Sequence, residues 1–345
     1  MRINYIFLFL YLLIFIQSCS EKSTTPENEL KYDYSKAPEG FPPIPFPENN
    51  PYSYDKAVLG RKLFYEKLLS RDMNLPSCSH CLKQQNSFCD NIPISKAADK
   101  EPEYRNTMPL TNVAYRKNIF WDGRATLVES PAYRSLWLPQ ILAADTNVIV
   151  QRLEKHPEYP ELFRKAFGDP KPSAFRISQA IATFVRTLVS GNSRYDKYIR
   201  GDSNALSEQE KRGMELFFSP RTSCSECHSG FLFTDGLYHN TGTSTHYFDR
   251  GRFYVTGINE DRGKFLTPSL RNVEVSAPYL HDGYFLTLEQ VIENYNKGGR
   301  AWFNKDPRVR PLNLTQQEKN DLIAFLKSLT DWEFLRNKWF SNPNK

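Results

Sequence analysis

The 345-residue sequence lacks a strong net charge, a membrane-length hydrophobic run and a complete set of paired cysteines. Its 45 Lys and Arg nearly balance 39 Asp and Glu and are scattered, which argues against a nucleic-acid surface. The 23 prolines and 16 glycines exclude a long coiled coil, and 40% hydrophobic residues exclude a disordered chain. The length predicts two domains, because a single core stops growing near ~250–300 residues.

The longest apolar run, residues 5–16, is shorter than the ~20 apolar residues of a membrane-spanning helix. The run follows Arg2 and is typical of a signal peptide. It ends at Ile16-Gln-Ser-Cys19, which resembles a bacterial lipobox and favours a lipoprotein over a plain secretory signal. We expect a signal peptide at 1–18, lipid on Cys19 and a polar linker at 19–50. The protein would then lie on the periplasmic side of a bacterial membrane and touch it only through the lipid.

Five cysteines follow Cys19, and an odd number cannot pair completely in disulfides. An exported chain of this size does not need a disulfide framework, so the spacing of the cysteines is the informative feature. Two pairs have two residues between their members, in Cys78-Ser-His-Cys81 and Cys224-Ser-Glu-Cys227.

The sequence contains the same motifs twice, in the same order. A Gly-x-x-Leu-Phe motif precedes each cysteine pair, at Gly60 and at Gly213. Asn-Val and Asp-Gly pairs then follow, and their two copies lie 160 residues apart, at Asn112 and Asn272 and at Asp122 and Asp282. This order predicts two homologous lobes, 51–192 and 193–345.

Helical signals dominate the secondary structure. Capping-box pairs precede three apolar runs, at Ser207 and Glu210, Thr287 and Gln290, and Thr315 and Glu318. One helical face carries Leu288, Val291, Ile292 and Tyr295, and residues 174–189 form another predicted helix. The long loops between these segments contain Gly and Pro, which is typical of a core filled by a large cofactor. We therefore predict a mainly α fold.

Cys224-Ser-Glu-Cys227-His228 is the C-x-x-C-H signature of covalent haem attachment. Two thiols about one helical turn apart can each form a thioether with a haem vinyl group, and the adjacent imidazole can bind the iron. A zinc site would need two further ligands, and a thioredoxin-like pair would need a βαβ context. The sequence indicates neither, so it predicts haem c with His228 as an iron ligand.

The first copy reads Cys78-Ser-His80-Cys81-Leu82, and leucine cannot bind iron. We favour loss of the haem, with two of Cys78, Cys81 and Cys89 joined in a disulfide. A second interpretation is a haem held by Cys78 and Cys81 with another iron ligand. A third is a metal site formed by the three cysteines and His80.

These motifs together resemble the bacterial di-haem cytochrome c peroxidase family, including its methylamine-utilisation branch, over about residues 51–330. The resemblance implies two cytochrome c-like lobes with long loops packed around haem. It also implies reduction of hydrogen peroxide in the first lobe, with electrons from a small donor such as a c-type cytochrome or a cupredoxin. The motifs that carry it are Leu59-Gly60-x-x-Leu63-Phe64, Arg105-Asn106-Thr107, Phe120-Trp121-Asp122-Gly123-Arg124, Cys224-x-x-Cys227-His228, Gly251-Arg252-Phe253, Leu270-Arg271-Asn272-Val273 and Ala277-Pro278-Tyr279-Leu280-His281-Asp282-Gly283.

The resemblance also implies roles for individual residues. Tyr295 stands 14 residues after His281, at the position of the distal iron ligand, which is a tyrosine in the methylamine-utilisation branch. Trp121 matches a tryptophan between the two haems. The structural alternative for both residues is a core aromatic. If Tyr295 is only that, His239, His246 or solvent becomes the candidate ligand. Three positions match a calcium site between the lobes, namely Asn106, Ser276 and Pro278.

The first lobe departs from the family at its peroxide site. The positions of the distal His, the catalytic Gln and the distal Glu fall on Ala98, on Pro131 and near Ile141. Peroxide cleavage needs an open iron site and a nearby acid–base group, for which Glu129 and Gln140 are the remaining candidates.

We therefore expect a haem c oxidoreductase related to cytochrome c peroxidase, with one haem favoured over two. The alternative function is a single-haem electron-transfer or sensing protein without peroxidase activity. Oxidative modification of a partner protein is a third hypothesis, and it would also need a reactive haem.

Overall fold

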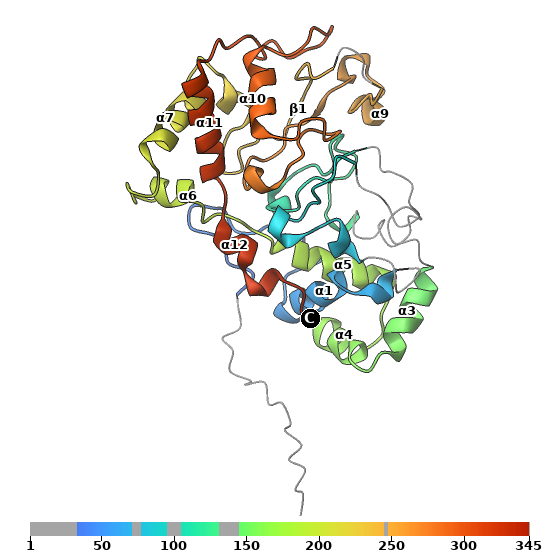
Figure 1. Cartoon of the computed structure of the whole chain (residues 1–345). Coiled ribbons are helices and arrows are strands. Elements are labelled where there is room, and N and C mark those ends of the chain that lie inside the picture. The colour runs from blue at the N-terminus through green and yellow to red at the C-terminus, as the bar shows by residue number, and fades with distance from the viewer. Residues whose placement is uncertain (1–32, 71–76, 95–104, 131–144, 245–247, 345) are drawn as a thin grey trace, which may run out of the picture. The chain divides into compact units, whose positions relative to one another are not determined.

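The computed structural model describes residues 33–70, 77–94, 105–130, 145–244 and 248–344, and residues 33–345 form one compact unit (Figure 1). The described chain is mainly helical with long connecting loops, which confirms the predicted fold class. Its only sheet among these residues pairs β1 (Tyr238–His239) with β2 (Phe265–Leu266) in an antiparallel arrangement. None of the described helices is long and apolar enough to span a membrane. The predicted signal peptide and Cys19 lie outside the described residues.

Two helix pairs form the frame of the molecule. In one, α1 (Tyr54–Phe64) packs against α5 (Ala174–Arg186), and in the other, α7 (Glu208–Phe218) packs against α11 (Gln316–Ser328). Both pairs are visible in Figure 1, with α1 and α5 in the lower part of the view and α7 and α11 in the upper part.

The repeated Gly-x-x-Leu-Phe motif places a glycine at each helix crossing. A Cβ atom on Gly60 would lie 1.8 Å from the carbonyl oxygen of Ala180, and one on Gly213 would lie 1.9 Å from that of Asp321. Only glycine allows backbones to approach this closely. The two copies of the motif thus have the same structural function.

Each helix pair belongs to a separate hydrophobic cluster. The first cluster includes Leu63, Phe64 and Phe184, and the second includes Phe217, Phe325 and Leu326. The C-terminal segment departs from this division, because Phe334, Leu335 and Phe340 pack into the first cluster. The two-lobe boundary near residue 192 remains a prediction, and the C-terminal segment would cross it.

The repeated Asn-Val motif also has one structural function. Asn112 and Asn272 both adopt left-handed backbone conformations, with φ of 60° and 59°, and each begins a short 3₁₀ turn. The backbone N–H of Asn112 donates to Leu188 at 2.8 Å, and that of Asn272 donates to Leu329 at 3.1 Å. Each motif therefore fastens a loop to the end of the helix pair in its own half.

The remaining elements are short and connect these frames. The three predicted capping boxes are present at the starts of α7, α10 and α11, and the predicted helix over 174–189 is α5. The other helices are α3 (Thr146–Lys155), α4 (Tyr159–Phe167), α6 (Arg194–Ile199), α8 (Cys224–Cys227), α9 (Phe253–Thr256), α10 (Leu288–Asn296) and α12 (Trp332–Arg336). The 3₁₀ turns are η1 (Lys67–Leu69), η2 (Cys78–His80), η3 (Gln84–Asn86), η4 (Val113–Tyr115), η5 (Asn259–Asp261), η6 (Val273–Val275) and η7 (Lys338–Phe340).

The close crossing of α7 and α11 predicts that an alanine at position 213 destabilises the protein, the opposite of the usual effect of this substitution in a helix. Replacing a helical glycine by alanine normally stabilises a helix by about 1 kcal/mol. We expect Gly213→Ala to lower the free energy of unfolding instead, by on the order of 1–3 kcal/mol, because the new methyl group collides with the Asp321 carbonyl. Chemical denaturation measures the change, with Glu215→Ala on the exposed side of α7 as control. A stabilised Gly213→Ala variant would contradict the crossing geometry.

Candidate functional site

A cavity of about 210 Å³ lies among α7, α8, α10 and α11. Apolar side chains form most of its wall, including Phe217, Leu288, Ile292, Leu322 and Leu326. The two cysteines of the intact C-x-x-C-H motif and the adjacent histidine also border it. The predicted attachment site therefore opens onto a largely apolar space.

The motif occupies one helical turn. Cys224 and Cys227 begin and end α8, and the backbone N–H of His228 donates to the carbonyl of Cys224 at 2.9 Å. Neither thiol is in a disulfide. Burial raises the pKa of Cys224, and it raises that of Cys227 to about 11, so both sulfurs are neutral thiols at neutral pH.

The loop after α8 fixes the His228 ring. The N–H of Asp235 donates to the carbonyl of Cys227 at 2.7 Å, and this closure brings the carbonyl of Phe233 to 3.1 Å from His228 Nδ1. A carbonyl oxygen only accepts, so Nδ1 carries the proton and Nε2 keeps its lone pair. Burial lowers the pKa of His228, which favours the same neutral form. This tautomer is the one that can bind a metal through Nε2.

The helix α10 brings Tyr295 to the same cavity. Leu288 and Ile292, on the same face of α10, are buried. Burial raises the pKa of Tyr295, and the neighbouring Cys227 and Cys224 raise it further, whereas a hydrogen bond with Thr241 lowers it. Tyr295 is thus a partly buried phenol that borders the same cavity as the thiols of α8. Its role as iron ligand remains a prediction.

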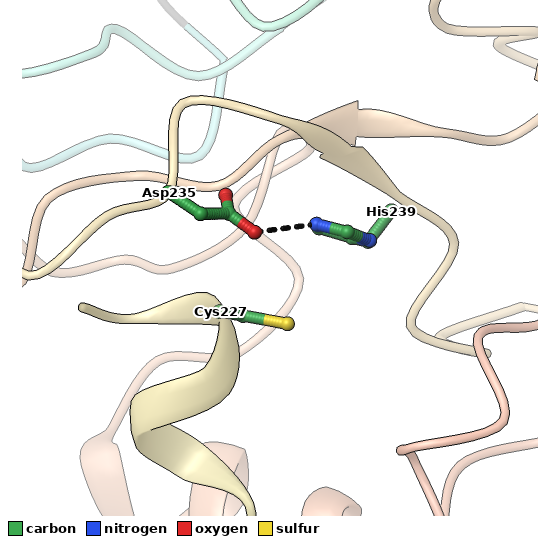
Figure 2. A group of neighbouring side chains, drawn as sticks. All are labelled: Cys227, Asp235 and His239. Carbon is green, nitrogen blue, oxygen red and sulfur yellow. Dashed lines mark hydrogen bonds and ion pairs between the residues drawn. The ribbon is translucent and has the colours of Figure 1, made fainter.

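Of the two histidines proposed as alternatives to Tyr295, one is hydrogen-bonded through both ring nitrogens and the other lies outside the described residues. His239 Nε2 lies 2.8 Å from Asp235 Oδ2, and its Nδ1 lies 2.8 Å from Asp306 Oδ2. Figure 2 shows the Asp235 and Cys227 side chains directed toward this ring. His246 lies outside the described residues. His281, which set the spacing to Tyr295, stacks on Phe265 with ring centroids 3.5 Å apart.

Trp121 borders the cavity and is 8% exposed. Its Nε1 donates to the Asn106 carbonyl at 2.9 Å, and its own carbonyl accepts from Leu266 at 2.8 Å. Arg105 joins Asp122, the residue after Trp121, to Asp249, at 2.6 Å and 2.5 Å. The indole is thus held where segments from both halves of the sequence meet.

The three predicted calcium positions, Asn106, Ser276 and Pro278, border this cavity as well. The side-chain nitrogen of Asn106 donates to the carbonyls of Ile92 and Pro93, at 3.0 Å and 3.2 Å, which leaves its side-chain oxygen as an acceptor. Carbonyl and amide oxygens are the donors that Ca²⁺ prefers. The Asn106 side-chain oxygen is a donor of this kind, and calcium binding remains a prediction.

The first-half cysteines do not form the disulfide or the metal site that the sequence suggested. No disulfide joins Cys78, Cys81 and Cys89, within the described part of the chain. Convergent groups of three metal ligands among these residues occur at Cys227, Asp235 and His239, not around His80. Cys89 instead donates to the carbonyl of Asn86 at 2.9 Å.

The degenerate motif packs into the first hydrophobic cluster. Cys78 and Leu82 both contact that cluster, and burial raises the pKa of the Cys78 thiol to about 12. Phe88 follows with φ of 59° and is fully buried, much as Phe233 follows His228 with φ of 54°. Both loops thus contain a buried phenylalanine in the left-handed conformation, whereas in the first copy an apolar side chain follows the second cysteine in place of the histidine.

Glu129 is engaged in an ion pair and not free for proton transfer. Its carboxylate accepts from Arg186 Nη2 at 2.8 Å and from Asn50 at 3.1 Å. Burial raises the pKa of Glu129, but the Arg186 guanidinium outweighs it and holds the pKa below its usual range. This geometry favours a structural role. Ala98, Pro131, Gln140 and Ile141 lie outside the described residues.

The chain belongs to the di-haem cytochrome c peroxidase family. Residues 54–204 match the family described as di-haem cytochrome c peroxidase. The methylamine utilization protein MauG of Methylorubrum extorquens is 33% identical over 91% of this chain and 90% of its own length. Cytochrome-c peroxidase IdrP1 of a Pseudomonas species is 35% identical over 84% of both chains. A solved MauG-like protein associated with microbial copper homeostasis has 34% identity and a TM-score of 0.86, and covers 90% of this chain and 99% of its own.

Sequence reasoning missed a set of charged residues at the cavity. Asp306 and Arg308 border it together with His239, and Arg308 binds Asp306 through Nε and Nη2 at 2.9 Å and 2.7 Å. These residues belong to no motif with a fixed spacing to the cysteines. The sequence suggested His239 only as a substitute iron ligand. Only the three-dimensional structure shows that Asp306 and Arg308 lie beside its ring.

The position of Tyr295 predicts a spectroscopic change. If Tyr295 binds the iron, Tyr295→Phe opens that coordination site, and the ferric protein changes from a low-spin to a high-spin spectrum. Electronic absorption and electron paramagnetic resonance measure the change. Tyr279→Phe is a matched control, because the Tyr279 hydroxyl donates to the Val273 carbonyl at 3.1 Å in the same cavity. If both variants keep the wild-type spectrum, Tyr295 is a core aromatic only.

Proposed function

We propose that this chain is an exported haem c oxidoreductase in which one haem, attached to the second lobe, transfers electrons. The observation that carries the proposal is the α8 turn, which presents two neutral thiols and the available Nε2 of His228 to one apolar cavity. These groups fit a c-type haem in kind and in order. Family membership supports the wider class of haem oxidoreductases.

The residues of the cavity have separate tasks. Cys224 and Cys227 would form the thioether bonds, and His228 would be the proximal ligand, oriented by its hydrogen bond to Phe233. Tyr295 would be the second iron ligand from this chain. When bound, the haem supplies a one-electron ferric–ferrous couple, and a phenolate ligand favours the ferric state.

The remaining residues exclude water and connect the site to the other half of the chain. The apolar wall keeps solvent from the ligands, which limits proton uptake when charge changes. Trp121 borders this wall and is fixed by Asn106, a position suited to electron passage toward the first lobe. The proposed donor is a small c-type cytochrome or cupredoxin.

Peroxide reduction is the second candidate function, and the relatives favour it because several are cytochrome c peroxidases. The first-lobe geometry favours electron transfer or sensing instead. Leu82 packs into the core at the place of the ligand, and Glu129 is paired with Arg186. Peroxide cleavage needs an open iron site with an acid–base group, and the described residues of this lobe supply neither.

We also propose that the mature chain lies on the periplasmic side of a bacterial membrane and is anchored by lipid on Cys19. Covalent haem attachment by C-x-x-C-H in an exported chain and the apolar run at 5–16 support this location.

The haem stoichiometry separates one haem from two. We expect a pyridine haemochrome assay, combined with the protein concentration, to give one haem per chain, because Leu82 cannot complete the first motif. The Cys224→Ser, Cys227→Ser double variant should bind no covalent haem, and the Cys78→Ser, Cys81→Ser control should retain all of it. Two haems per chain, with one lost in the control, would refute the single-haem proposal.

Peroxide turnover separates the two candidate functions. With a reduced c-type cytochrome as donor, we expect hydrogen peroxide to be consumed no faster than by a heat-denatured sample, since the described residues of the first lobe lack the acid–base group. Stopped-flow oxidation of the donor measures the rate. Saturable turnover that depends on both peroxide and donor would instead establish a peroxidase.

A further inference from the structure

Two aspartates, a histidine and an arginine form a continuous network beside the attachment turn. Asp235 contacts His239, His239 contacts Asp306, and Asp306 binds Arg308, with the joining distances between 2.7 Å and 2.9 Å. We call this set the cavity-edge network. Cys227, Asp235 and His239 present ligand atoms within 4.8 Å of one another, so the network adjoins the second attachment sulfur (Figure 2).

The network is well ordered by hydrogen bonds and largely withdrawn from solvent. The side chains of Asp235, His239 and Asp306 are 11–12% exposed, and that of Arg308 is 32% exposed. The backbone adds further contacts, because Asp306 Oδ1 also accepts from the Arg308 N–H at 3.0 Å, and the Asp306 N–H donates to Asn240 at 2.9 Å. His239, Asp306 and Arg308 are thus fixed at the wall of a largely apolar cavity.

Arg308 retains binding capacity toward the cavity. Its Nε and Nη2 bind Asp306, and Nη2 also lies 3.1 Å from His239 Nδ1. Its Nη1 has no hydrogen-bond partner among the described residues, although Arg308 borders the cavity. A guanidinium held along one edge can still bind a carboxylate with the nitrogens that remain.

The haem assigned to this cavity would bring two propionate carboxylates. A carboxylate that leaves water for a largely apolar space needs a cation or several donors to offset its desolvation. Arg308 and Arg310 are the arginines that border the cavity. Arg310 is exposed and donates to the carbonyl of Pro220 at 3.2 Å, so its guanidinium is directed to the segment between α7 and α8.

We propose that Arg308 binds a propionate carboxylate of the cofactor and that Asp306 and His239 position its guanidinium for this task. The proposal rests on the proposed haem of the second lobe and adds a binding residue to it. Asp306 fixes the guanidinium plane through two parallel hydrogen bonds, His239 supports Asp306, and Asp235 supports His239.

The test uses the holoprotein and two readouts other than activity. Resonance Raman spectra report the bending modes of the haem propionates, and a redox titration gives the midpoint potential. In Arg308→Gln, we expect a shifted propionate mode and a lower potential, because removing a positive charge favours the ferric state. In Arg308→Lys, the potential should stay near the wild-type value while the mode still shifts, since lysine retains the charge but not the fork geometry.

Two further variants separate binding from loop packing. Arg310→Gln is the matched control and should leave both readouts unchanged. His239→Gln should shift the propionate mode in the same direction as Arg308→Gln but by less, because it loosens Asp306 without removing the guanidinium. If Arg308→Gln fails to retain haem, the propionate modes of Arg308→Lys and His239→Gln test the assignment instead. A shifted mode in both variants supports it, and an unchanged mode in both overturns it.

Each outcome counts for or against the proposal. If the propionate mode is unchanged in Arg308→Gln, or shifts equally in Arg310→Gln, the assignment of Arg308 is overturned. The proposed haem of the second lobe is not affected by that result. A wild-type chain without covalent haem would overturn the proposed function and this inference together. The pyridine haemochrome assay on every variant distinguishes these two failures.

Discussion

The hydrogen bond between His228 Nδ1 and the carbonyl of Phe233 is the constraint on which the proposed site depends. It assigns the ring proton to one nitrogen and leaves the other available as a ligand. The bond exists because the loop folds back onto α8, through the contact of Asp235 with the Cys227 carbonyl. The orientation of His228 therefore depends on the short loop after α8, which also supplies Asp235 to the cavity-edge network.

The two halves of the chain retain one frame and differ in what fills it. Gly60 and Gly213 permit matching close helix crossings, and Asn112 and Asn272 fasten matching loops. In the second half, apolar walls surround a cavity of about 210 Å³. In the first half, Leu82 and Cys78 pack against the core cluster. A frame stabilised by helix packing tolerates either residue after the second cysteine, because most of its packing does not involve that position.

Local sequence patterns predicted much of this structure. Capping boxes at Ser207, Thr287 and Thr315 depend on residues three positions apart, and they appear as predicted. The C-x-x-C-H motif needed only neighbouring residues as well. The family resemblance was confirmed by comparison with known relatives.

Long-range contacts could not be predicted in the same way. Glu129 and Arg186 lie 57 positions apart, and His239 and Asp306 lie 67 positions apart, so no periodicity relates them. The expected disulfide among Cys78, Cys81 and Cys89 was wrong because spacing along the chain does not fix where sulfurs lie in space. The return of Phe334 and Phe340 to the first cluster was likewise absent from the lobe prediction.

The central claim is that haem chemistry resides in the second lobe alone. Protease digestion of the holoprotein followed by mass spectrometry of its peptides locates covalent haem residue by residue. We expect haem mass on the peptide that contains Cys224 and Cys227, and no added mass on the peptide that contains Cys78 and Cys81. Haem mass on the peptide containing Cys78 and Cys81 would contradict it.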